Sequence, residues 1–178
     1  MRLTLFSDYA LRVLLYTAAA GDRLVTIEET ARAYGISKAH LMKVVNILTR
    51  TGYVKGKRGR SGGFMLARPP EEIRLGEVVR ATEPDFALVE CFGAGNRCFI
   101  TGSCRMANVL NEALSAFAAT LDRYTLKDIL LERRDFEAPR LPPGVRRGPL
   151  FDASPPPEPV VAGPVDPADG VSDGNDND

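Results

Sequence analysis

Residues 26–50 read TIEETARAYGISKAHLMKVVNILTR, a sequence that predicts two helices joined by a tight turn. Thr26 and Glu29 have the spacing of a capping box, in which each side chain satisfies a backbone amide at the start of a helix. That helix should end near Tyr34, and Ser37 should cap a second helix over residues 38–51. The apolar residues of the second helix recur at one-turn spacing on one face, and its other face is polar and basic. This pattern is typical of a helix-turn-helix, whose second helix enters the DNA major groove.

The flanking sequence completes a small winged domain. Residues 4–20 predict a helix with a wide apolar face, and residues 75–82 predict another short helix. Between them, residues 53–67 predict a β-hairpin whose glycine-rich tip carries Lys55, Lys57, Arg58 and Arg60. Glycine lets such a tip approach phosphate closely, and arginine can enter a narrow minor groove. The predicted fold is therefore mainly α with a small β-hairpin, a winged helix-turn-helix.

All three cysteines of the chain lie within fourteen residues, at Cys91, Cys98 and Cys104. Three thiols are one too many for a disulfide and one too few for a closed zinc site. They suit an iron–sulfur cluster whose last iron has another ligand. Two alternatives remain open on the residues alone, a zinc site completed by Asp8 or His40 and a set of free thiols.

A long amphipathic helix follows the cysteines, over about residues 104–124. Its apolar residues recur over five turns, and a second copy of the chain is the economical way to cover such a stripe. We therefore expect a homodimer, with the alternative that the stripe packs on its own domain. A last short helix is expected to start at Thr125 and end near Arg134.

Charge and composition divide the chain. Residues 1–80 carry 14 Lys and Arg against 7 Asp and Glu, which favours a polyanionic partner for this half. Residues 139–178 hold ten of the thirteen prolines, a composition that cannot bury a core. The sequence shows neither an apolar run of about 18 residues nor a signal-like start, so we expect a cytoplasmic protein.

The motifs together resemble a known family. They are Phe6-Ser-Asp-Tyr-Ala-Leu-Arg12, Tyr34-Gly-Ile-Ser37, the wing Arg58-Gly-Arg-Ser-Gly-Gly63 and the three-cysteine loop. This combination resembles the iron–sulfur winged-helix regulators that include NsrR, IscR and RirA, over about residues 1–132. Within that family the match is to the NsrR type of nitric-oxide-sensitive repressor. No histidine follows Cys104 closely, as it would in an IscR-like member.

The resemblance implies a cofactor, a signal and partners. It implies a [4Fe-4S] cluster, with [2Fe-2S] as the alternative, held by Cys91, Cys98, Cys104 and, from the partner subunit, Asp8. Asp8 could instead cap the first helix. The implied function is repression of transcription on double-stranded operator DNA, relieved by nitric oxide. A RirA-like iron sensor and a zinc-bearing DNA-binding protein without sensing are the alternatives.

These expectations assign residues and domains. The DNA-binding set comprises Thr26, Ser37, Lys38, His40, Lys43, Lys57, Arg58 and Arg60. The expected domains are the winged helix-turn-helix (1–82), the cysteine loop (83–103), the dimerisation and short helices (104–134) and a disordered acidic tail (135–178). An enzyme is disfavoured, because the sequence has no C-x-x-C, no Ser/His/Asp set and no phosphate-cradling motif.

Overall fold

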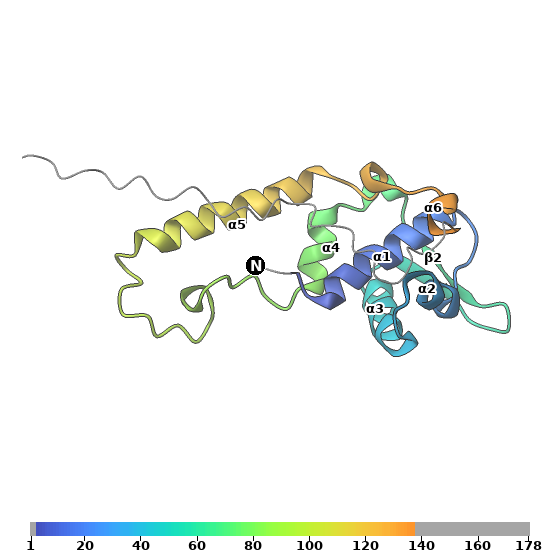
Figure 1. Cartoon of the computed structure of the whole chain (residues 1–178), viewed down its shortest axis with the longest axis horizontal. Helices are drawn as coiled ribbons and strands as arrows, with labels where there is room; N and C mark the ends of the chain where they lie inside the picture. The colour runs from blue at the N-terminus through green and yellow to red at the C-terminus, as the bar shows by residue number, and fades with distance from the viewer. Residues whose placement is uncertain (1–2, 138–178) are drawn as a thin grey trace, which may run out of the picture. The chain divides into compact units, whose positions relative to one another are not determined.

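The computed structural model describes residues 3–137, which form a mostly helical unit with one antiparallel hairpin (Figure 1). The α-helices and strands are α1 (Leu5–Ala19), α2 (Ile27–Tyr34), α3 (Lys38–Arg50), β1 (Val54–Lys57), β2 (Gly63–Leu66), α4 (Leu75–Thr82), α5 (Arg105–Arg123) and α6 (Arg133–Glu137). Short 3-10 turns lie at Pro70–Glu72, Glu90–Phe92 and Lys127–Ile129. The predicted fold class is confirmed, and the winged helix-turn-helix is present in full. Most of the predicted tail lies outside the described residues.

Two local predictions are wrong. Asp8 does not cap α1: the cap is Thr4, whose hydroxyl accepts a hydrogen bond from the Ser7 amide at 3.3 Å. Asp8 lies one turn into the helix instead. The expected single helix from Thr125 to about Arg134 is two pieces, a 3-10 turn and α6, because Leu130 is extended between them.

The core is built around α1. Its buried Ala10, Val13 and Leu14 pack in one cluster with residues of α3, the hairpin and α4. The buried face of α3 comprises Leu41, Val44 and Leu48, as its apolar spacing predicts. This packing fixes α3 by its inner face and leaves the polar face in solvent.

The hairpin is joined through β2 to the segment that leads into α2. β1 and β2 pair antiparallel, with Val54 opposite Leu66 and Lys57 opposite Gly63. Phe64 is buried and exchanges two backbone hydrogen bonds of 2.8 Å with Val25, the residue that precedes the α2 cap. The wing is therefore anchored to the helix-turn-helix, with its basic tip projecting from the anchored end.

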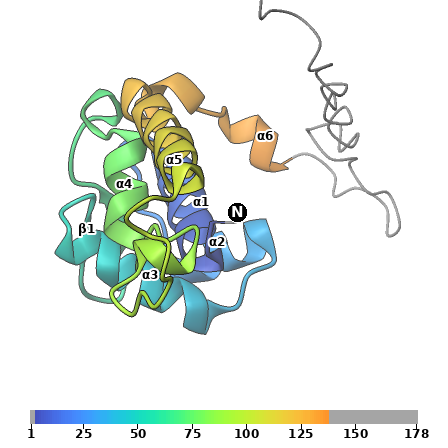
Figure 2. The same ribbon diagram turned by 90° about the vertical axis from the view of Figure 1, so that its left-hand side faces the viewer.

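α4 joins the DNA-binding core to α5, whose C-terminal end lies beside α4 while the rest of the helix extends away from it (Figures 1 and 2). Val78 and Val79 of α4 are buried in the core. On the other side, Gly76 lies so close to α5 that an added Cβ would overlap the Asp122 carboxylate and lie 3.1 Å from its backbone nitrogen. Arg80 then holds that carboxylate through two hydrogen bonds of 2.6 and 3.1 Å. A glycine and an ion pair thus set how closely α5 approaches α4.

Among residues 3–137, no helix has both the length and the apolar character needed to cross a membrane.

We predict that Gly35→Ala destabilises the fold by about 1 kcal/mol. A residue with a Cβ costs about 1–2 kcal/mol in the left-handed conformation. Alanine also lowers the conformational entropy of the unfolded chain, and this offsets part of that cost. Gly35 has φ of 68° and ends α2, and an added Cβ would meet no atom within 4 Å. The matched control is Gly95→Ala, which has equally open space and no positive φ. Urea denaturation of both variants is the measurement. Equal stability of the two would contradict the prediction.

Candidate nucleic-acid interface and cysteine loop

α3 presents the polar face expected of a recognition helix. Lys38, His40 and Lys43 are all exposed, while the opposite side of the helix is buried in the core. Ser37 caps the helix by accepting a hydrogen bond from the His40 amide at 3.3 Å. The Ser37 hydroxyl also lies 3.0 Å from His40 Nδ1, and the imidazole lies beside the Tyr9 ring with centroids 6.2 Å apart. His40 is therefore oriented by two neighbours, although it is exposed.

The start of α2 is held by the predicted capping box. The Thr26 hydroxyl accepts from the Glu29 amide at 3.1 Å, and Glu29 Oε2 accepts from the Thr26 amide at 3.2 Å. Glu29 also pairs with Arg23 at 2.7 Å and accepts a hydrogen bond from the Tyr16 hydroxyl at 3.3 Å. Burial acts to raise the pKa of Glu29, but the hydrogen bonds from Arg23 and Thr26 outweigh it and hold that pKa below its ordinary value.

The wing tip carries cations without carboxylate partners. Lys57, Arg58 and Arg60 are exposed, and none of them forms an ion pair with a carboxylate of residues 3–137. The tip turn is closed by a backbone hydrogen bond from Gly62 to Gly59 at 2.9 Å. Because these cations have no carboxylate partner within the described residues, they can contact phosphate without first breaking an internal ion pair.

Lys38 differs from the wing cations, because it forms an ion pair with Glu28 of α2. This role of Glu28 was not predicted from the sequence. Glu28 lies in the first turn of one helix of the motif and Lys38 begins the next, but a pair ten residues apart has no helical periodicity to mark it. The turn between the two helices brings them together.

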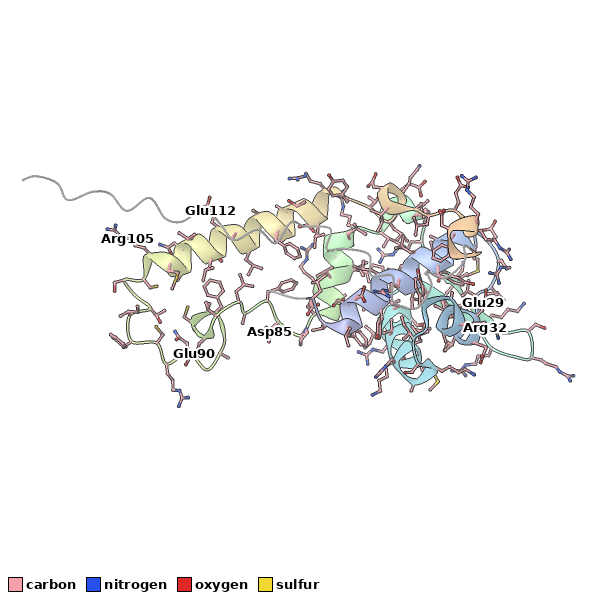
Figure 3. The ribbon with its side chains drawn as sticks, in the orientation of Figure 1. Glu29, Arg32, Asp85, Glu90, Arg105 and Glu112 are labelled. Carbon is pink, nitrogen blue, oxygen red and sulfur yellow. The ribbon has the colours of Figure 1, made fainter. Side chains whose placement is uncertain are left out.

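The three cysteines lie on the loop that joins α4 to α5, and all three are free and partly buried. Cys104 occupies the N-cap position of α5. Cys98 lies in a turn closed by local hydrogen bonds: its amide donates to the Asn96 side chain at 2.9 Å, and its carbonyl accepts from the Thr101 hydroxyl at 2.7 Å. Figure 3 labels Glu90 on this loop; its carboxylate accepts a hydrogen bond from the Arg97 amide at 3.3 Å.

The cysteines and Asp8 are not brought together into a metal-binding group. Within the described residues, no three His, Cys, Asp or Glu side chains have the geometry to hold a metal ion. The donor set itself fits an iron–sulfur cluster, because three unpaired thiols on one loop supply the ligand type such clusters use. One chain therefore contains ligands of the right chemical type, but its described residues do not place them in the geometry of a metal site.

Asp8 is occupied by a different partner. Arg12, one turn further along α1, holds it with two contacts of 2.9 and 2.8 Å. Arg12 also lies over the Tyr34 ring, 5.8 Å from its centroid, and its carbonyl accepts a hydrogen bond from the Tyr34 hydroxyl at 2.9 Å. Burial raises the pKa of Tyr34, so the hydroxyl keeps the proton that it donates. Phe136 of α6 packs edge-on against Tyr34 and extends this cluster, a contact that the sequence did not predict.

A groove of about 430 Å³ lies between the start of the cysteine loop and α5. Its walls include Phe86 and Leu88 of the loop and Leu110, Leu114 and Phe117 of α5. No residue of α5 is buried, and Met106 and Val109 are 67% and 64% exposed. Most of the predicted apolar stripe is therefore only partly covered within one chain.

The fold and the exposed basic elements define a winged helix-turn-helix of the kind that binds DNA. Residues 3–132 match the Rrf2 family, described as "Iron-dependent Transcriptional regulator". The chain belongs to this family. It is therefore a transcriptional regulator, in a family of DNA-binding proteins, and not an enzyme.

Individual relatives support the assignment. The chain is 50% identical over 137 residues to the HTH-type transcriptional regulator NsrR of Bacillus subtilis strain 168. The aligned residues cover 76% of this chain and 94% of that protein. The chain is 49% identical over 135 residues to NsrR of Geobacillus kaustophilus, with 75% and 92% covered. Among solved structures, T. potens IscR superposes with a TM-score of 0.58 at 24% identity, covering 72% of this chain and 85% of that one, which shows a shared fold.

We predict that Glu29→Gln flattens the acid limb of the stability profile. The folded-state pKa of Glu29 lies below its ordinary value of 4.5, so its carboxylate stabilises the fold above that pH, and this contribution is lost as pH falls through the folded value. At neutral pH the variant should lose about 1 kcal/mol, as for a weakened helix cap. Thermal unfolding of both proteins from pH 7 to acid is the measurement. The control is Glu112→Gln on α5 (Figure 3), and equal acid sensitivity of wild type and Glu29→Gln would refute the prediction.

Proposed function

We propose that this protein is a transcriptional repressor that holds an iron–sulfur cluster through Cys91, Cys98 and Cys104 and loses operator affinity on exposure to nitric oxide. The observation that carries the proposal is the pairing of a basic winged helix-turn-helix with three free cysteines on the loop that leads into α5. Identity near 50% with proteins named NsrR over most of the chain supports the same function. When bound, such a cluster would supply irons able to react with nitric oxide.

The protein is proposed to act as a homodimer through α5. The exposed Met106 and Val109 support this, because an amphipathic helix of nineteen residues with no fully buried side chain is only partly covered within the described residues. Two copies would then present two recognition helices to a two-fold operator, and their spacing would decide the affinity. α4 is placed to pass a change in α5 to the core, because it contacts both α5 and α1.

Residues Thr26, Ser37, Lys38, His40, Lys43, Lys57, Arg58 and Arg60 are proposed as the DNA-contacting set. Their side chains play different parts. The hydroxyls of Thr26 and Ser37 are engaged in helix caps, so their contribution is to fix the helix starts that face phosphate. The cations of α3 and the wing would contact phosphate, and His40 would lie in the groove.

An iron-responsive repressor is the second candidate, and the family description "Iron-dependent Transcriptional regulator" favours it. The two candidates share the cysteines and the DNA interface. They differ in the signal, since an iron sensor would lose its cluster and its DNA affinity under chelation, and would need no nitric oxide.

We predict that anaerobically purified protein contains matched iron and sulfide and absorbs broadly at roughly 400 nm. Nitric oxide should bleach this band and weaken binding to operator DNA. Cys91→Ser, Cys98→Ser and Cys104→Ser should each lower iron content, whereas the exposed Ser115→Ala on α5 should not. A colourless wild-type protein with stoichiometric zinc would refute the sensing proposal. Bleaching only by chelator would favour the iron-responsive candidate.

We predict that Asp8→Ala changes the rate of the nitric oxide reaction, because Asp8 of the partner subunit is proposed as the fourth ligand. The bidentate contact with Arg12 competes for that carboxylate. Arg12→Ala should free Asp8 and change the rate of the nitric oxide reaction in the direction opposite to the change in Asp8→Ala. Stopped-flow absorbance of the three proteins is the measurement. If Asp8→Ala retains a cluster that responds like wild type, Asp8 is not the ligand.

A further inference from the structure

The ion pair between Glu28 and Lys38 connects the two helices of the helix-turn-helix. Glu28 is the second residue of α2, and Lys38 is the first residue of α3. The Lys38 ammonium contacts Glu28 Oε2, and Arg32 approaches the other carboxylate oxygen at 3.8 Å. Both members of the pair are exposed, at 61% for Lys38 and 53% for Glu28. The pair therefore lies in solvent at the start of the recognition helix.

Lys38 is distinguished from the other cations proposed to face DNA. Within residues 3–137, Lys43, Lys57, Arg58 and Arg60 form no ion pair with a carboxylate, whereas Lys38 does. Glu28 therefore lies beside Lys38 at the N-terminal end of α3, the helix proposed to enter the DNA major groove. The hydrogen bond from Lys38 holds the pKa of Glu28 below its ordinary value, so the carboxylate is ionised at neutral pH.

The pair changes the energetics of phosphate binding. A free lysine that reaches a phosphate releases a counterion from the DNA and gains a charge-assisted contact. Lys38 must first give up a carboxylate, and Glu28 is then left with its negative charge near the phosphate backbone. An exposed pair is weak, so the effect should be an adjustment of affinity rather than a block.

We propose that Glu28 is an affinity-setting residue that competes with DNA phosphate for Lys38. The inference rests on the proposed function only in that the protein binds DNA, and it is independent of the cluster and its signal. Phosphate contacts carry no sequence information, so Glu28 lowers the affinity for operator and unrelated DNA by a similar factor. It keeps binding weak enough for a modest change elsewhere in the protein to release it.

The alternative role for Glu28 is local. A carboxylate in the first turn of a helix interacts favourably with the helix dipole, and Glu28 stands in that turn of α2. That role predicts a loss of thermal stability on Glu28→Gln and no change in the affinity for DNA. The two roles are therefore separated by measuring both quantities on the same variant.

The test measures binding of a mixed-sequence DNA duplex over a range of salt concentrations, with Glu112→Gln as the control that removes the same charge from exposed α5 (Figure 3). Glu28→Gln should bind about threefold to tenfold more tightly at low salt, with a salt slope steeper by about one for each recognition helix engaged. Glu112→Gln should show neither effect. Lys38→Gln should weaken binding more in the Glu28→Gln background than in wild type, because only there is Lys38 free.

The outcomes distinguish this inference from the proposed function. If wild type binds no duplex at all, the DNA-binding function itself fails. If wild type binds and Glu28→Gln behaves like Glu112→Gln, the role of Glu28 is overturned and the function stands. Should Glu28→Gln fold poorly, Glu28→Asp keeps the charge at the start of α2 and withdraws it from Lys38. It should then give a smaller gain in affinity, and no gain would overturn the inference.

Discussion

The contact between α4 and α5 at Gly76 and Asp122 connects the two halves of the described structure. An added side chain at Gly76 would overlap Asp122, and Arg80 holds the same carboxylate from the next turn of α4. A second connection follows at once, where the Leu75 amide donates to the Tyr124 carbonyl at 2.9 Å. The helix that follows the cysteine loop is therefore fixed to the DNA-binding core at its far end, and the cysteines lie at the other end.

This arrangement has a mechanical consequence. α5 is attached near its C-terminus, and its first residues have little packing within one chain, with Met106 67% exposed. A helix held at one end turns about that end, so a change at the cysteine loop would move α5 against α4. The buried hydrogen bond of 2.8 Å between Ser7 and Thr82 then ties the end of α4 to the start of α1. α1 in turn packs on α3, so the route from loop to recognition helix consists of packed helices throughout.

The sequence predicted the parts of this fold whose signals are local. The capping box at Thr26, the cap at Ser37 and the one-turn apolar spacing of α3 each report on residues within a few positions, and all were confirmed. The cap of α1 was missed, because Thr4, Ser7 and Asp8 are all good capping residues and only the tertiary contacts of Thr4 select it. Two hydrogen bonds from Thr4 to Glu83, a residue 79 positions away, fix that choice.

The candidate site was harder to predict for a related reason. Residue type and spacing predict Cys91, Cys98 and Cys104 as cluster ligands, but they do not report which cations are already paired. Asp8 and Arg12 are one helical turn apart, so their pair could have been anticipated from spacing. The pair of Glu28 and Lys38 crosses a turn and depends on how two helices are packed. In both cases a charge expected to meet an external ligand is already engaged inside the chain, so the proposed binding would be an exchange of partners. Both internal pairs are exposed to solvent and therefore weak, so such an exchange would be easily reversed, as a regulator that must release DNA requires.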